Sequence, residues 1–101
     1  MYKLSFYAEA KDEYDKLEGH QKKHIDKGLN KIIERGMSAG HPLEGDLSHC
    51  RKIKHRQLGL RIIFKQSEKC IEIIEIVAIG KRDKKSVYKN VDVRLKNSRR
   101  Q

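Results

Sequence analysis

The chain contains 101 residues, in which 24 Lys and Arg outnumber 14 Asp and Glu and give a net charge of +10. This length fits one domain, residues 1–101, with a single modest core. No apolar run approaches the roughly 20 residues of a membrane span. The first residues alternate like a strand and do not resemble a signal peptide. We therefore expect a cytoplasmic protein without a membrane partner.

The charge favours a nucleic-acid partner, because each Lys or Arg that neutralises a phosphate releases counterions and adds salt-dependent affinity. A pI near 9.8 is equally compatible with a soluble protein that is merely basic. The positions of the cations must therefore decide between the two interpretations.

The first third of the chain predicts a strand followed by a helical hairpin. Residues 2–6 alternate and are β-prone. Residues 8–17 carry apolar side chains at helical spacing, and after Gly19 a longer stripe consists of Ile25, Leu29, Ile32 and Ile33. Gly36 is well placed to end the second helix.

The remainder predicts three strands and a helix. The strands span about 51–56, 60–66 and 71–78, and their short connections indicate antiparallel neighbours. The third is apolar on both faces over much of its length, which favours a central position. Val87, Val91 and Leu95 then form a helical stripe. The predicted fold is α+β, a small antiparallel sheet with an N-terminal helical hairpin packed on one face and a short C-terminal helix.

Cations gather in the first of these strands. A two-residue period places Lys52, Lys54 and Arg56 on one face, with Ile53 and His55 on the other. Like charges on one face of a sheet are destabilising. Stability therefore does not explain the arrangement, whereas a bound polyanion does.

A second group of cations surrounds the start of the C-terminal helix: Lys81, Arg82, Lys84 and Lys85. The positive end of the helix dipole favours acids there, so added cations indicate an anion site, with Asp83 as a possible cap. Tyr88 lies about 100° round the helix from Val87 and can face that site. The alternative is that Tyr88 is a half-buried aromatic at the edge of the stripe.

Other chemistry has little support, and we predict no cofactor and no metal. His20 and His24 have i, i+4 spacing but no third ligand nearby. Cys50 and Cys70 match no paired-cysteine motif and are interpreted as packing residues. His49 or His55 remains open as an auxiliary base.

An ordered set of short motifs resembles the RelE toxins of bacterial and archaeal toxin–antitoxin pairs. The motifs are LEGDL at 43–47, RKIK at 51–54, GLRIIF at 59–64, IGKRD at 79–83 and VY at 87–88. The resemblance implies an endoribonuclease that enters the ribosomal A site and cuts mRNA there. It also implies that the catalytic residues are Lys52, Lys54, Arg61, Arg82 and Tyr88.

These residue types suit RNA cleavage without a metal, in which the 2′-OH is deprotonated and the phosphorane charge is stabilised. Lysine is normally a poor base, with an ordinary pKa of about 10.4. Crowding by other cations disfavours its charged form, so Lys52 or Lys54 is the candidate base. Arg61 can present its guanidinium to the non-bridging oxygens. Arg82 can stabilise the leaving group, and Tyr88 can stack on or orient a base.

The net charge of +10 further predicts an acidic, partly disordered antitoxin that folds on binding. Arg56, Lys81, Lys84 and Lys85 are predicted to hold RNA phosphates. The alternative functions are a ParE-like gyrase inhibitor without catalysis and a basic RNA-binding module.

Overall fold

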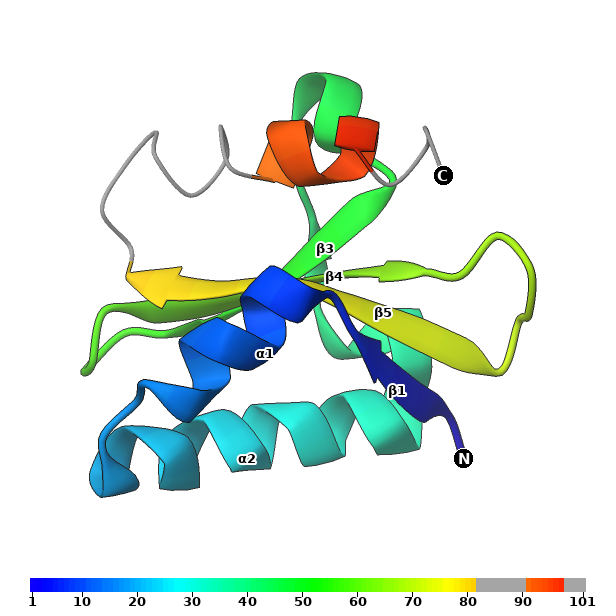
Figure 1. Ribbon diagram of the computed structural model, residues 1–101. Helices are drawn as coiled ribbons and strands as arrows, with labels where there is room; N and C mark the ends of the chain where they lie inside the picture. Colours follow the sequence, from blue (N-terminus) through cyan, green and yellow to red (C-terminus); the bar gives the residue numbers. More distant parts are fainter. Residues whose placement is uncertain (82–90, 98–101) are drawn as a thin grey trace.

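The computed structural model describes residues 1–81 and 91–97 (Figure 1). Its elements in chain order are β1 (Lys3–Phe6), α1 (Ala8–Asp15), α2 (Gly19–Arg35), the 3-10 helix η1 (Gly36–Ala39), β2 (His41–Pro42), the 3-10 helix η2 (Gly45–Leu47), β3 (Cys50–His55), β4 (Leu60–Gln66) and β5 (Ile73–Lys81). Residues 91–97 form a further helix. Within these two segments, no helix is long and apolar enough to cross a bilayer.

The described strands form one five-stranded sheet in the order β1-β5-β4-β3-β2. From β2 to β5 all neighbours pair antiparallel, as the short connections predicted. β1 instead runs parallel to β5, which makes the sheet mixed. The predicted α+β fold is confirmed. The direction of β1 was not foreseen, because its alternation reports burial and carries no information about its partner.

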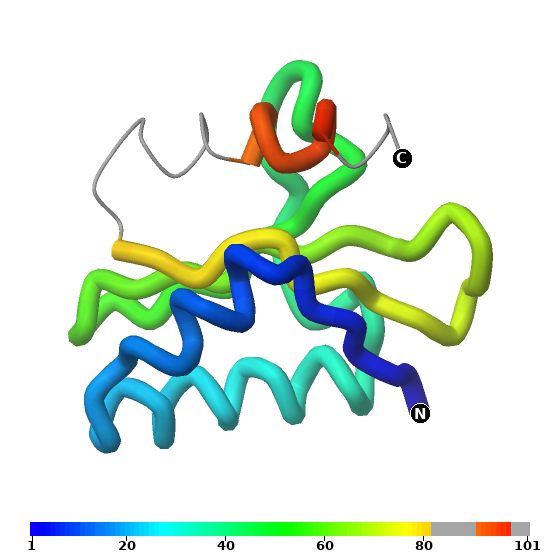
Figure 2. Tube along the Cα trace, viewed as in Figure 1, coloured from blue at the N-terminus to red at the C-terminus, as the bar shows by residue number. Residues whose placement is uncertain are grey.

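The sheet separates two layers. Helices α1 and α2 cover one face, whereas helix 91–97 lies over the other face near η2 (Figure 2). The predicted stripe of α2 is buried at Ile25, Leu29 and Ile32 against Phe64 and other residues of the sheet. Each such side chain contributes about 1.5–3 kcal/mol on burial. Gly36, with a φ of 63°, follows the helix as predicted.

Strand β5 is buried on both faces, which confirms its central position. Ile74, Ile76 and Ile79 belong to the core under the helical hairpin. Val77 and Ala78 belong to a second core that includes residues of helix 91–97. A β-bulge, in which Ile63 pairs with Ala78 and Phe64 with Ile76, leaves Val77 as the extra residue of β5, so that Val77 and Ala78 both face the second core.

The predicted strand 71–78 starts two residues too early. Residues 71 and 72 form a turn, and the side chain of Ile71 is 77% exposed. The side-chain nitrogen Nε2 of Gln66 lies 3.1, 2.8 and 3.0 Å from the carbonyl oxygens of Cys70, Ile71 and Ile73. Its two hydrogens are shared among these three acceptors. The side chain of Gln66 thus holds the turn, a role that apolar periodicity cannot reveal.

An ion pair anchors the C-terminal helix to the edge of β5. Strand β1 ends opposite Ile76, which leaves the next part of that edge without a strand partner. There the Glu13 carboxylate accepts a hydrogen bond from the Ile79 amide at 3.1 Å, and Arg94 donates to the Val77 carbonyl at 2.8 Å. Arg94 and Glu13 also form a two-pronged pair at 2.8 and 3.0 Å. Together the two side chains replace a missing strand.

We predict that Arg94→Ala lowers the free energy of unfolding by about 2 kcal/mol. The substitution leaves the partly buried Glu13 carboxylate and the Val77 carbonyl oxygen without their hydrogen-bond donor. Lys96→Ala is the matched control, since its pair with Asp92 is solvent-exposed and should contribute less than about 0.5 kcal/mol. Urea titration measures both. Equal stability of the two variants would contradict the anchoring role of Arg94.

Gly40 sits where the chain passes close to β3. A Cβ atom there would lie 2.6 Å from the Lys52 carbonyl oxygen and 2.8 Å from the Phe64 ring. Neither neighbour can move freely, because one is backbone and the other is fully buried. The missing side chain therefore allows β2 to seat beside β3.

Gly40→Ala should destabilise the fold by about 1–3 kcal/mol through this overpacking. Gly19→Ala is the control, because a Cβ at Gly19 meets nothing within 4 Å and the helix gains from the replacement. Thermal unfolding followed by circular dichroism compares them. A Gly40→Ala protein that melts with the parental midpoint would show that the backbone accommodates the methyl group.

Candidate functional site

The register of three strands places the predicted cations on one face. Lys54 of β3 lies opposite Arg61 of β4, and Arg61 lies opposite Gly80 of β5. Directly opposed residues project to the same face of a sheet. This face is the one that α1 and α2 do not cover, since the neighbouring Ile63 packs in the core under helix 91–97. Gly80 adds no side chain beside Arg61.

Lys54, Arg56 and Arg61 line one hollow of about 170 Å³, together with His55 and Leu60. Strand β3 ends at His55, so Arg56 belongs to the following turn and not to the strand as predicted. The turn still brings Arg56 beside the other two cations. Of the described residues that line this hollow, none is acidic.

Two cations outside this hollow, Lys65 and Arg94, each form an ion pair with a carboxylate. Lys65 lies on the same strand as Arg61 and is only 8% exposed, but its ammonium is 3.3 Å from the Glu75 carboxylate. Arg94 is likewise paired with Glu13. Both of these buried or nearly buried cations have a carboxylate partner close by.

Lys52 lies two residues before Lys54, on the same face, and opposes Ile63. It lines a separate hollow of about 360 Å³ with Leu43, Glu44 and Leu47. The two lysines thus line different hollows along one strand. Successive side chains on one face of a strand are about 7 Å apart, a distance that a single nucleotide linkage can span.

Two features of the site were missed by sequence reasoning. His41 of β2 pairs with Lys52, so this histidine stands beside the lysine on the same face. A strand of two residues has no periodicity that could have revealed it. The second is Gly80 of the IGKRD motif, which lies opposite Arg61, a placement that only the strand register reveals.

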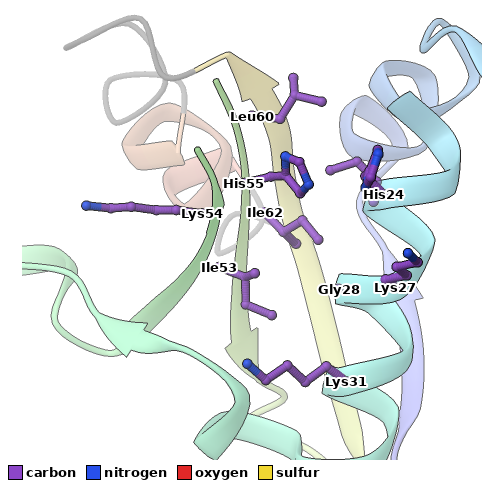
Figure 3. A pocket seen from close by; sticks show the side chains of 10 residues that line it. His24, Lys27, Gly28, Lys31, Ile53, Lys54, His55, Leu60 and Ile62 are labelled. Carbon is purple, nitrogen blue, oxygen red and sulfur yellow. The ribbon is translucent and has the colours of Figure 1, made fainter. Parts of the chain in front are cut away.

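His55 projects away from the lysines, as predicted. In Figure 3, Lys54 and His55 lie on opposite sides of β3. The ring of His55 packs against His24 of α2 in a tilted arrangement, with 4.4 Å between ring centroids and 49° between the ring planes. Partial burial and the neighbouring His55 lower the pKa of His24. His55 therefore belongs mainly to the contact between α2 and the sheet.

Cys50 is excluded as a nucleophile. It is fully buried on the site face, opposite Lys65. Burial raises the pKa of the Cys50 thiol to about 11, although Lys65 acts in the other direction. The thiol is therefore neutral near pH 7 and inert, in line with its interpretation as a packing residue.

The remaining predicted residues are placed as follows. Lys81 is the exposed last residue of β5 and opposes Leu60, so the alternation sends it to the other face from Arg61. Arg82, Lys84, Lys85 and Tyr88 lie outside the described residues, as does the predicted anion site at the start of the C-terminal helix.

Comparison with solved structures defines the fold class. The isolated RelE toxin of Escherichia coli is similar over 94% of this chain and 99% of that chain, with a TM-score of 0.71 and 26% identity. A mutant of the same toxin in complex with a peptide of the antitoxin RelB is similar over 87% of this chain and 90% of that chain, with a TM-score of 0.71 and 26% identity. No protein-family model matches the sequence.

A curated relative settles the family. An Escherichia coli protein named as a RelE-like toxin is 30% identical over 95 residues, which cover 94% of this chain and 98% of the relative. The chain belongs to the RelE-like toxins. The resemblance inferred from the short motifs is confirmed.

Proposed function

We propose that this protein is a ribosome-dependent endoribonuclease that cleaves mRNA in the ribosomal A site and acts in the cytoplasm. The observation that carries the proposal is the strand register that opposes Lys54 to Arg61. Membership of the RelE-like toxins supports the same activity.

The proposed reaction needs no metal. The 2′-oxygen attacks the adjacent phosphorus, a bond from the 2′-oxygen to phosphorus forms, and the bond from phosphorus to the 5′-oxygen breaks. Lys52 or Lys54 takes the 2′-OH proton as general base. Arg61 binds the non-bridging oxygens, where negative charge develops in the transition state.

The predicted residues beyond β5 complete the proposal. Arg82 stabilises the departing 5′-oxygen, which takes a proton from solvent as it leaves, and Tyr88 stacks on a base. Arg56, Lys84 and Lys85 hold neighbouring phosphates, whereas Lys81 lies on the other face from Arg61 and is not part of the proposed site. Such a set of cations is a weak catalyst by itself. Because orientation can supply a large part of a barrier, the ribosome provides what the protein lacks by fixing the mRNA.

The proposal includes a protein partner, an acidic antitoxin encoded next to this chain. The net charge of +10 supports it, because complementary charge accelerates association and selects partners. The complex of Escherichia coli RelE with a RelB peptide shows that a related toxin of the same fold binds its antitoxin.

Arg61→Ala and Arg82→Ala should each abolish toxicity, with cleavage lowered by about 10²–10³, because each removes a cation from the developing charge. The fold should persist in the Arg61→Ala protein, since Arg61 belongs to neither core. Growth assays together with circular dichroism test both variants. Lys69→Ala, which removes an exposed cation from the turn before β5, is the control. A folded Arg61→Ala protein with full toxicity would remove Arg61 from the site.

If a lysine is the base, its neutral form is required, and single-turnover cleavage on programmed ribosomes should rise by up to about tenfold per pH unit. The rise should continue well past pH 7, whereas a histidine base would level off near its ordinary pKa of about 6.5. Lys52→Ala and Lys54→Ala should lower the chemical step more than binding. His41→Ala, His49→Ala and His55→Ala are the controls. Loss of the pH dependence in a histidine variant alone would contradict the assignment.

A further inference from the structure

A second groove lies on the other side of β3 from the cation site. It has a volume of about 310 Å³ and runs between α2 and the strands β3 and β4. Figure 3 shows this groove, with Ile53, Leu60 and Ile62 projecting from the strands toward α2. The Lys54 side chain points away from it. A ligand in this groove would therefore occupy a different surface from the proposed active site.

The floor of the groove is aliphatic. Ile25, Leu60 and Ile62 are almost fully buried beneath it, and Ile53 is half-buried at its wall. Gly28 brings α2 close to the sheet here, since a Cβ atom would lie 2.8 Å from the terminal methyl of Ile62. No side chain of α2 can therefore fill the space at that position.

The rim of the groove is cationic. Lys27 and Lys31 line it from α2 and are exposed, four residues apart on one helix face. Neither ammonium has a carboxylate partner within residues 1–81 and 91–97, and the described lining contains no acid. His24 lies at one end of the groove, and its pKa is lowered by partial burial and by the neighbouring His55 and Lys27. The positive charge of the rim near pH 7 therefore comes from the lysines.

We propose that the groove between α2 and β3 receives an acidic, amphipathic segment of the antitoxin, a proposal that rests on the proposed function. Aliphatic side chains of the segment pack against Ile53 at the wall of the groove, and carboxylates one helical turn apart meet Lys27 and Lys31. We choose this occupant because acidic side chains complement the exposed lysines at the rim, Lys27 and Lys31. RNA fits less well, because bases stack on aromatic faces. The two imidazoles at this groove, His24 and His55, pack against one another and are less available to a base.

The separation of the two surfaces makes the proposal specific. A segment bound between α2 and β3 contributes affinity without covering Lys52 or Arg61, which do not line the groove, or the end of the Lys54 side chain, which points away from it (Figure 3). Altering the groove should therefore leave cleavage intact and weaken neutralisation by the antitoxin. Altering the cation site should have the opposite effect.

The test compares Lys27→Glu/Lys31→Glu with Lys3→Glu/Lys69→Glu. Both double variants change the net charge equally, and the control lysines are exposed but do not line the groove. The probe is the purified acidic protein encoded beside this chain. We expect Kd to rise by about tenfold or more for the groove variant and to stay within about twofold for the control. Both variants should remain toxic without the probe.

Two further measurements keep the outcomes separate. Hydrogen exchange of the parental complex should show protection at residues 24–31, which tests the groove even if a charge reversal prevents folding. Binding of polyuridine is measured in parallel. Equal antitoxin affinity of the two variants, no protection of α2, or a selective loss of RNA affinity in the groove variant would each overturn the proposal. Failure of the parental chain to cleave mRNA would instead overturn the proposed function.

Discussion

Burial of Ile62 and Phe64 under α2 determines to which face of the sheet the other side chains of β4 project. Because successive side chains in a strand alternate, these two residues send Arg61, Ile63 and Lys65 to the opposite face. A slip of one residue would bury Arg61 in the core and expose Phe64. The apolar core thus aligns Arg61 with Lys54 on one side and Gly80 on the other, although it contains none of the chemistry.

The same constraint divides the protein into two surfaces. One face carries the cations and is partly covered by helix 91–97, which the Glu13–Arg94 pair ties to the edge of β5. The other face is covered by α2 except along the groove at Ile53. The proposed catalytic site and the proposed antitoxin groove therefore lie on opposite sides of β3 (Figure 3).

Features encoded by local periodicity were predictable from sequence. The stripe of α2, the end of that helix at Gly36 and the alternation of Lys52 and Lys54 all follow from spacing along the chain. Features that depend on distant partners were not predictable. The parallel pairing of β1, the approach of His41 to Lys52 and the Glu13–Arg94 pair require the folded topology. Arg56 was assigned to the strand, but it follows the strand in a turn that no spacing rule specifies.

The central claim is that the cations around Lys54 and Arg61 cut mRNA on the ribosome. Primer extension on mRNA from cells that express the chain tests it most directly, with the Arg61→Ala protein as the matched control. The account predicts discrete cuts within translated codons, in phase with the reading frame, that are absent from the control. Intact mRNA together with DNA damage would contradict the account and favour a gyrase inhibitor of the same fold.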